Sequence, residues 1–395
     1  MKREESRPAR PDRLTLAAAA RRGCLAEGID LSDYGALARL AERELVRAEA
    51  MIREVQPDLA PGFLRPVPEA ARDPRTGDLV VFGPGRALRT FRGASEFCIV
   101  EDGELSPIFA RRALSGAERF AFVNLNLFPI LSPGAADAAP APAPSPRGLH
   151  FLFWPSNVHA DDWGAMTVAD VATGLGLLAD LERACLTSSE AWHLRSGDGA
   201  AGEHFGHFRI IRNSGERVGG SVAHPHLQAA HGGAADGHAL RDVRFLAERG
   251  IGFGPWVARG AGEEHVVRDY GEFVWLVPPF ARRRLHGLIV PRSGDRNFLY
   301  ELDEEGRSSL ARALGDFTRA LPRAMERAGL EPAHNLVFHA GPIGGLYVEA
   351  IAPTQTVGGF EQAGMWINLQ RPADSARAFR EASEAAESDG RRPVR

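Results

Sequence analysis

The sequence contains few cysteines and no strong excess of one charge, and both shortages exclude classes of protein. Only three cysteines occur, Cys24, Cys98 and Cys185, and no two of them form a CxxC pair. A disulfide framework is therefore excluded, and this usage fits a reducing compartment. The formal net charge of -4 provides no global field for nucleic acid or an anionic membrane. Any phosphate recognition must therefore be local.

The chain also lacks a long apolar run. Near the N-terminus, the stretch "LTLAAAA" is soon followed by arginines. It is too short to span a bilayer, and it makes a poor secretory signal. We therefore expect a cytoplasmic protein that binds neither membrane nor nucleic acid.

The length and the order of motifs indicate two similar halves. A chain of 395 residues exceeds the ~250–300 at which single cores usually stop growing. The order of strand, helix, strand, glycine pair and strand occurs twice, which predicts duplication of one α+β unit. We expect an N-terminal helical extension over 1–70, a first half over 71–235 and a second half over 236–395.

Three further segments have recognisable character. Apolar residues recur at helical spacing over 31–57, with a cap at Ser32 or Asp33. The stretch "GAADAAPAPAPSPRG" is rich in alanine and proline and is expected to be a flexible loop. A C-terminal helix is expected after Pro372.

The stretch "GGSVAHPHLQ" has the strongest chemical signal. His224 and His226, two residues apart on an extended segment, point to the same side, and Pro225 stiffens the backbone between them. Imidazole is largely neutral at cell pH, so it can act as a nucleophile or a metal ligand. The alternative is two solvated loop histidines. The residues just upstream supply backbone freedom and donors for a phosphate: Gly219, Gly220 and Ser221.

Several segments appear in the order of a known family. "RNSGERVGGSVAHPHLQ" contains an Asn, a Gly, a Ser and then His-Pro-His-x-Gln. It is accompanied by "DPRTGDLVVFGPGRALR", "NLFPIL" and "GGFEQAGMWIN". Together these segments resemble the galactose-1-phosphate uridylyltransferase family of the histidine-triad (HIT) superfamily, from about Asp73 to Asn368. The resemblance implies a duplicated HIT-like α+β fold, with two antiparallel sheets and packed helices.

The resemblance also implies a ping-pong nucleotidyltransferase. His226 would attack the α-phosphorus of a nucleoside diphosphate sugar and form a covalent nucleotidyl-histidine, which a second phosphate acceptor resolves. Gln228 would hydrogen-bond a phosphate oxygen, and its place favours transfer over hydrolysis. His224 would orient the site. The matching substrate-binding positions are Arg86, Arg89, Asn126, Asn213, Gly219, Gly220, Ser221 and Glu361.

Some of these positions have simpler alternatives. Arg86 and Arg89 match arginines that reach the substrate from the neighbouring subunit of a dimer, and guanidinium groups suit phosphate oxygens. They could equally be two solvated loop arginines. Glu361 matches a sugar-hydroxyl contact, but it is a lone glutamate in a glycine-rich loop. The resemblance implies a homodimer.

Both metal sites of the family look depleted in this sequence. At the zinc site, Ser95 stands at one cysteine place, which leaves Cys98, His159 and His224 as possible ligands. Zinc prefers four ligands in a structural site, so we expect a weakened site or none. Cys98 could instead be a small buried hydrophobic residue. The second site lacks its His-x-His pair, so we expect it to be lost, with His339 remaining alone.

We predict an enzyme of carbohydrate metabolism that transfers a nucleotide, UMP by resemblance, between a nucleotide sugar and a sugar 1-phosphate. One alternative is a phosphorylase of a dinucleoside polyphosphate or a nucleotide sugar, with inorganic phosphate as the acceptor. Another is a catalytically silent nucleotide-binding protein, which the missing metal ligands motivate.

Overall fold

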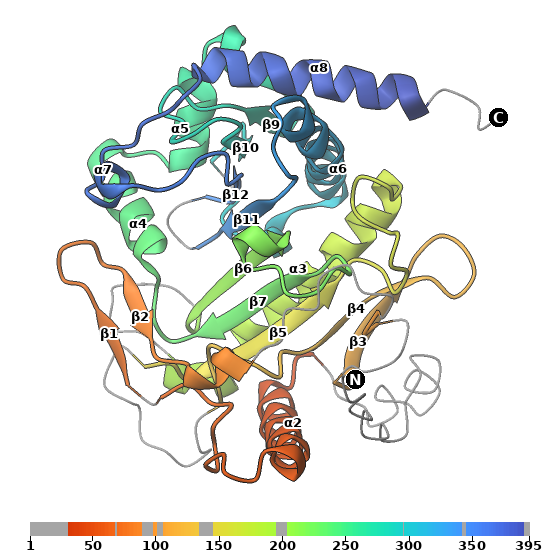
Figure 1. Cartoon of the computed structure of the whole chain (residues 1–395), viewed down its shortest axis with the longest axis vertical. Helices are drawn as coiled ribbons and strands as arrows, with labels where there is room; N and C mark the ends of the chain where they lie inside the picture. The colour runs from red at the N-terminus through yellow and green to blue at the C-terminus, as the bar shows by residue number, and fades with distance from the viewer. Residues whose placement is uncertain are drawn as a thin grey trace, which may run out of the picture.

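The computed structural model describes residues 31–67, 69–88, 98–100, 106–133, 145–194, 204–294, 296–341 and 345–390. Within these ranges the chain forms one ten-stranded sheet, a separate two-stranded sheet and helices packed against them (Figure 1). All pairs of neighbouring strands in the large sheet are antiparallel. Its strands are β3 (Ile108–Ala113), β4 (Phe120–Leu125), β5 (Gly148–Trp154), β6 (His207–Ser214), β7 (Leu227–Gly232), β8 (Val266–Asp269), β9 (Phe273–Leu276), β10 (Gly287–Pro291), β11 (His334–His339) and β12 (Tyr347–Ile351).

The two halves of the large sheet have the same internal order. The first runs β3-β4-β5-β7-β6 and the second β8-β9-β10-β12-β11, so in each half the fifth strand lies between the third and the fourth. A long helix, α3 (Val168–Thr187) or α6 (Glu304–Arg327), connects the third and fourth strands. This shared order confirms the predicted duplicated α+β fold. The two expected sheets are continuous, because β6 pairs with β11. The predicted limits at residues 70 and 235 stay predictions.

Helices α3 and α6 begin at side-chain caps and pack against each other. Thr167 Oγ1 accepts a hydrogen bond from Asp170 N at 3.1 Å, and Asp303 Oδ1 accepts one from Gly306 N at 2.9 Å. Such caps satisfy backbone donors that the first turn of a helix leaves unpaired. One hydrophobic core extends through both halves and includes Phe151 of the first half and Phe317 of the second. The halves are therefore packed as one body.

The N-terminal extension forms helix α2 (Tyr34–Val55), which confirms the helix expected over 31–57. Asp33 is its cap, since Asp33 Oδ1 accepts a hydrogen bond from Ala36 N at 2.7 Å. Its apolar face joins the main core through Leu37 and Leu40. The hydroxyl of Tyr34 lies 3.2 Å from His231 Nδ1, at the far end of β7. The extension is therefore anchored to the first half.

The remaining elements surround this core. The small sheet pairs β1 (Ala70–Arg72) with β2 (Leu79–Val81), and the predicted C-terminal helix is confirmed as α8 (Pro372–Gly390). The other helices are α4 (Gly237–Arg249), α5 (Phe253–Gly260) and the short α7 (Gly359–Gln362). Most of the Ala/Pro-rich segment, residues 134–144, lies outside the described residues. Within the described part, every helix is too short or too polar to cross a bilayer.

Candidate active site

The His-Pro-His segment lies at the start of β7, in the middle of the first half. His224 and His226 directly precede this strand and are both buried. Their rings contact the same indole, that of Trp154 at the end of β5, with centroid distances of 5.4 and 5.0 Å. The sequence predicted that the two side chains point to one side, and the shared contact with Trp154 confirms it.

The hydrogen bond of His226 selects its tautomer. His226 Nδ1 lies 2.9 Å from the carbonyl oxygen of His224. A carbonyl oxygen only accepts, so Nδ1 carries the proton, and Nε2 of the neutral ring carries the lone pair. The arrangement therefore prepares one defined nitrogen for attack on an electrophile.

Gln228 and Asn126 are brought together beside this segment. Gln228 pairs with Leu152 on one side and Ile211 on the other. Its Oε1 lies 3.5 Å from Asn126 Nδ2, a long hydrogen bond. Asn126 Oδ1 accepts a hydrogen bond from Phe128 N at 2.9 Å, which holds the amide in place. Two amide side chains thus lie at neighbouring positions on the sheet.

Sequence reasoning missed His150, which belongs to this cluster. Its Nε2 lies 3.3 Å from Asn126 Nδ2, and its Nδ1 accepts a hydrogen bond from Ile130 N at 3.0 Å. No second histidine stands near His150 at a spacing that would mark a motif. The alternation of β5 was a usable signal, since His150 and Leu152 lie on the same face of a strand that pairs with β7.

The glycine-rich turn before the histidines is built around its backbone. Gly219 has a φ of +85°, a left-handed conformation that favours glycine. Gly220 N donates to Gly215 O at 3.0 Å, and a Cβ on Gly220 would meet that oxygen at 2.8 Å. Asn335 Nδ2, on β11, donates to Asn213 Oδ1 at 2.7 Å and to Val218 O at 3.2 Å, and the second bond ties the turn to β11. Ser221, two residues before Ala223, is buried.

The other predicted substrate contacts are dispersed. Arg86, in a short 3-10 helix (Pro84–Leu88), donates to Phe128 O at 2.6 Å and so contacts the Asn126 turn. Arg89 lies outside the described residues. Glu361 lies in α7 of the second half, where Oε2 accepts a hydrogen bond from Gly358 N at 2.9 Å. The structure therefore joins Arg86 to the first-half cluster, while Glu361 makes this bond within its own turn.

The three predicted zinc ligands form a group. Cys98 Sγ lies 3.2 Å from His224 Nδ1 and 3.3 Å from His159 Nδ1. His224 Nε2 donates to Ser156 O at 2.9 Å, which leaves Nδ1 as the nitrogen that faces the sulfur. Nitrogen and sulfur donors at this spacing fit zinc. Ser95, at the place of the fourth ligand, lies outside the described residues.

A second group corrects the expectation that His339 stands alone. His238, His339 and Glu349 offer ligand atoms within 4.8 Å of one another. His339 Nε2 lies 3.4 Å from Glu349 Oε2, and its Nδ1 lies 3.7 Å from Asp242 Oδ2. The sequence prediction compared one histidine with a His-x-His pattern. It overlooked a carboxylate on β12 and a histidine on α4, which only the fold brings together.

In this second group, the pKa shifts favour a neutral His339 and an ionised Glu349. Burial lowers the pKa of His339, which favours the neutral imidazole. Burial alone would raise the pKa of Glu349, but its contacts with His286 and His339 hold that pKa well below its usual range. Arg282 also forms an ion pair with Glu349. A buried anionic carboxylate thus lies beside neutral imidazole nitrogen, a donor set suited to a divalent cation.

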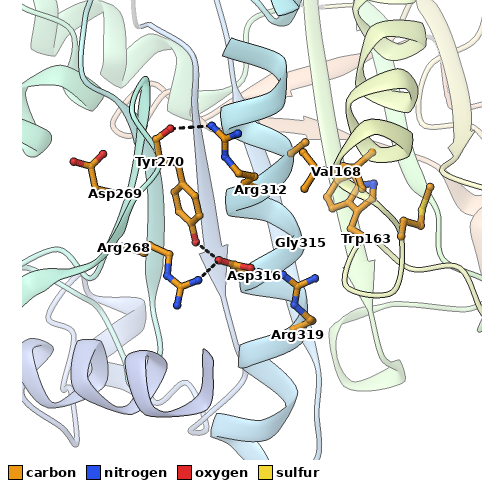
Figure 2. Close-up of a pocket in the computed structure, with 12 residues that line it drawn as sticks. Trp163, Val168, Arg268, Asp269, Tyr270, Arg312, Gly315, Asp316 and Arg319 are labelled. Atoms are coloured by element: carbon orange, nitrogen blue, oxygen red, sulfur yellow. Dashed lines mark hydrogen bonds and ion pairs between the residues drawn. The ribbon is translucent and has the colours of Figure 1, made fainter. Parts of the chain in front are cut away.

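A cavity lies elsewhere, between the N-terminal end of α3, helix α6 and strand β8. It encloses about 520 Å³. Figure 2 shows α6 between Tyr270 and Trp163, with Asp316 accepting hydrogen bonds from Arg268 and from the Tyr270 hydroxyl. None of the predicted site residues is among those that line it. The first-half cluster is therefore recognised from its side-chain chemistry and not from cavity size.

The comparisons with known proteins agree with this fold. No family model matches the chain. A curated relative, ADP-glucose phosphorylase from Arabidopsis thaliana, is 23% identical over 347 residues, which cover 80% of this chain and 93% of the relative. A solved uridylyltransferase has a TM-score of 0.59 at 18% identity and covers 80% of this chain and 99% of its own. A crystal structure of the Arabidopsis thaliana ADP-glucose phosphorylase with bound ADP-glucose has a TM-score of 0.59 at 20% identity, with coverage of 80% and 99%. The resemblance found in the sequence is thus confirmed at the level of the fold.

Proposed function

Because this chain has the fold of a uridylyltransferase and an ADP-glucose phosphorylase, we propose that it is an enzyme that transfers the nucleotidyl group of a nucleotide sugar. One observation carries the proposal: the hydrogen bond from His226 Nδ1 to His224 O leaves Nε2 as the nucleophilic nitrogen of a neutral imidazole. The segment directly precedes β7, a strand that pairs with β5 on one side and β6 on the other.

The proposed reaction has two displacements. His226 Nε2 attacks the α-phosphorus, an N–P bond forms, and the P–O bond to the sugar 1-phosphate breaks. A phosphate oxygen of the acceptor then attacks the same phosphorus, and the N–P bond breaks. The first step releases the sugar 1-phosphate anion, and the second releases the neutral imidazole of His226. Neither leaving group needs a strong acid, which suits an amide at Gln228.

The neighbouring residues support the phosphates. In the turn of Gly219, Gly220 and Ser221, the glycines have no side chain that would keep a phosphate away from the backbone. We propose that backbone N–H groups of this turn bind the phosphate next to the nucleophile. Asn126 and Gln228 offer amide groups on the same side of the sheet. We propose that Asn213 holds the turn, and that Arg86 binds phosphate from its place beside Phe128.

Two acceptors compete within this mechanism. Transfer of UMP to a sugar 1-phosphate is the first candidate, on the likeness to uridylyltransferase. Phosphorolysis with inorganic phosphate is the second, because the curated relative and a similar solved structure are an ADP-glucose phosphorylase. The two reactions share the covalent intermediate and differ only in the anion that resolves it.

Covalent labelling tests the proposal directly. The protein is incubated with UDP-glucose, ADP-glucose or GDP-mannose that carries a ³²P label at the α-phosphate, and acid-labile labelled protein is measured. We expect label from one base in preference. Release by glucose 1-phosphate then indicates a transferase, and release by inorganic phosphate indicates a phosphorylase. Absence of label from every nucleotide, with binding retained, would contradict the mechanism and favour the silent nucleotide-binding alternative.

We propose that the Cys98, His159 and His224 group holds zinc in a structural role. The zinc would orient His224 and thereby the backbone carbonyl that accepts the proton of His226 Nδ1. His238, His339 and Glu349 form a second candidate group for a divalent cation. Elemental analysis of the purified protein, compared with Cys98→Ser and His238→Ala variants, would assign each metal to its group.

We also propose a homodimer. Apolar side chains gather on the segment 357–369, where Phe360 is 62% exposed, Met365 63% and Leu369 66%. Such a patch is typical of a protein contact. Sedimentation analysis of Phe360→Ser/Leu369→Ser should show monomers, while Val46→Ser, at an exposed apolar residue of α2, should remain dimeric. Cys98 and Cys185 form no disulfide, which is consistent with a cytoplasmic location, and we also propose that location.

A further inference from the structure

The cavity between the two halves has the size of a small-molecule site. It encloses about 520 Å³, within the roughly 300–1,000 Å³ typical of ligand pockets. One side comes from the first half, at the segment that leads into α3, and the other from β8 of the second half, with α6 running between them (Figure 2). A ligand held here would therefore contact both halves of the protein.

The side of the cavity that belongs to the first half is apolar. Trp163 and Met166 are buried there, and Val168 is 40% exposed. On α6, Ala311 and Gly315 also line the cavity; they lie one turn apart, and neither has a side chain large enough to fill it. An organic group placed in the cavity would thus remove apolar surface of both halves from water, which favours binding.

The opposite side carries charged groups, and most of these are already paired. Asp316 accepts hydrogen bonds from Arg268 at 2.7 Å and from the Tyr270 hydroxyl at 2.8 Å, and it forms an ion pair with Arg319. Arg268 also pairs with Glu387 of α8 at 2.6 Å. Two guanidiniums and two carboxylates therefore compensate one another in this network.

Arg312 is the lining arginine that this network leaves out. Its Nη2 donates to the carbonyl oxygen of Tyr270 at 3.2 Å, and it forms no ion pair with any described residue. Asp316, one turn further along α6, is engaged by the two arginines of the network. Asp269, the other carboxylate that lines the cavity, pairs with Arg292. One positive charge is thus available to an anionic group of a ligand.

The charges around Arg312 distinguish between classes of anion. A guanidinium fork matches the oxygens of both carboxylates and phosphates. Asp269 and Asp316 also line the cavity, so a doubly charged phosphate would meet more repulsion there than a carboxylate with a single charge. A single unpaired guanidinium beside an apolar surface therefore suits a monoanion with a hydrophobic body.

We propose that this cavity binds a small apolar monocarboxylate, with the carboxylate on Arg312 and the organic body against Trp163 and Val168. None of the residues assigned to nucleotidyl transfer lines the cavity. Binding here is separate from that reaction and involves no covalent step.

Calorimetric titration tests the chemical class of the ligand. The probes are 3-phenylpropionate, octanoate, the uncharged 3-phenylpropanamide and the dianion phenyl phosphate. We expect wild type to bind at least one carboxylate, and to bind the amide and phenyl phosphate at least about tenfold more weakly, because the first lacks the charge and the second carries too much of it. A preference between the two carboxylates assigns the body of the ligand as aromatic or aliphatic.

Variants on both sides of the cavity test its location. Arg312→Met should weaken carboxylate binding at least about tenfold, and Arg312→Lys, which keeps the charge but not the fork, should weaken it less. Val168→Asp places a like charge on the first residue of α3, where an acidic side chain suits the helix dipole, so it should weaken binding while the protein stays folded. The matched control is Val46→Asp, at a 53% exposed valine of α2, which should bind as wild type.

Thermal unfolding provides a second readout. A ligand that binds only the folded protein should raise the Tm of wild type, and 3-phenylpropionate should raise that of Arg312→Met less. Absence of carboxylate binding to folded wild type overturns the proposal. So does equal affinity of wild type, Arg312→Met and Val168→Asp, or tighter binding of phenyl phosphate than of either carboxylate. Covalent labelling of His226 is measured independently, so each of these results is distinguishable from a failure of nucleotidyl transfer.

Discussion

The two halves of this protein share one topology and differ in the chemistry of the fifth strand. In the first half, His224 and His226 directly precede β7, and β7 presents the amide of Gln228 between its neighbours. In the second, β12 presents Glu349 in the same situation, between β10 and β11. The Glu349 carboxylate is ionised and surrounded by Arg282, His286 and His339. The fold therefore supplies a position on a central strand, and the side chain at that position decides what it can do.

The largest expected effect is on nucleotidyl labelling, which should depend on the first half and not on the second. His226→Ala should reduce nucleotidyl labelling and turnover by at least about 10³-fold, because the attacking nitrogen is removed. Tyr347→Phe, at the start of the corresponding strand of the second half, should leave labelling near wild type. Quantification of ³²P on the two variants checks this. Equal labelling of His226→Ala and wild type would place the nucleophile elsewhere.

The next effect concerns stability and the second half. Glu349→Gln should lower the free energy of unfolding by about 3 kcal/mol, because Arg282 loses its charged partner and His286 and His339 lose the buried carboxylate that they contact. Urea denaturation measures the loss. Labelling of His226 should persist under native conditions, since the variant changes only the second half. A stability equal to wild type would show that the Glu349 network is solvated and weak.

A third prediction concerns the pH dependence of stability and Glu182, whose side chain contacts the second half. Glu182 of α3 accepts a hydrogen bond from Tyr300 N at 3.0 Å, and burial raises its pKa to about 8. The unfolded chain releases this proton near the ordinary value, while the folded protein retains it until about pH 8. Stability should therefore fall as pH rises between these values, by up to about 1.4 kcal/mol per unit.

Glu182→Gln should remove most of this dependence. The amide keeps a carbonyl acceptor for Tyr300 N but has no proton to release. Denaturation of wild type and variant at pH 5.5 and 8 compares the two slopes. Identical slopes would mean that Glu182 is already ionised in the folded protein at pH 5.5.

The smallest expected effect sharpens the role of the amide in the first half. Gln228→His introduces a group that can protonate a leaving group, so hydrolysis of the nucleotide sugar should rise relative to transfer by roughly tenfold. Gln228→Glu is the matched variant, because it introduces the carboxylate of the second half and should slow attack on an anionic phosphate. Product ratios with and without acceptor measure the change. An unchanged ratio in Gln228→His would remove the amide from the choice between transfer and hydrolysis.

Local sequence patterns predicted much of the fold. The helical periodicity of 31–57 and the tail after Pro372 appear as α2 and α8, with Asp33 as the cap of α2. The repeated order of strand, helix and strand predicted the duplication. The edge strands β3 and β8 and the helices α4 and α5 were not predicted from the sequence.

For the candidate site too, some residues follow from local sequence and others only from the tertiary structure. The sequence by itself determined the pair His224 and His226 and the glycine turn before it, because their chemistry depends on neighbours a few residues apart. Only the tertiary structure decided that His150 lies beside Asn126, and that His238 and Glu349 gather around His339. These contacts join strands and helices far apart in the chain, so no local spacing encodes them. They arise because strand pairing brings distant side chains to the same face of one sheet.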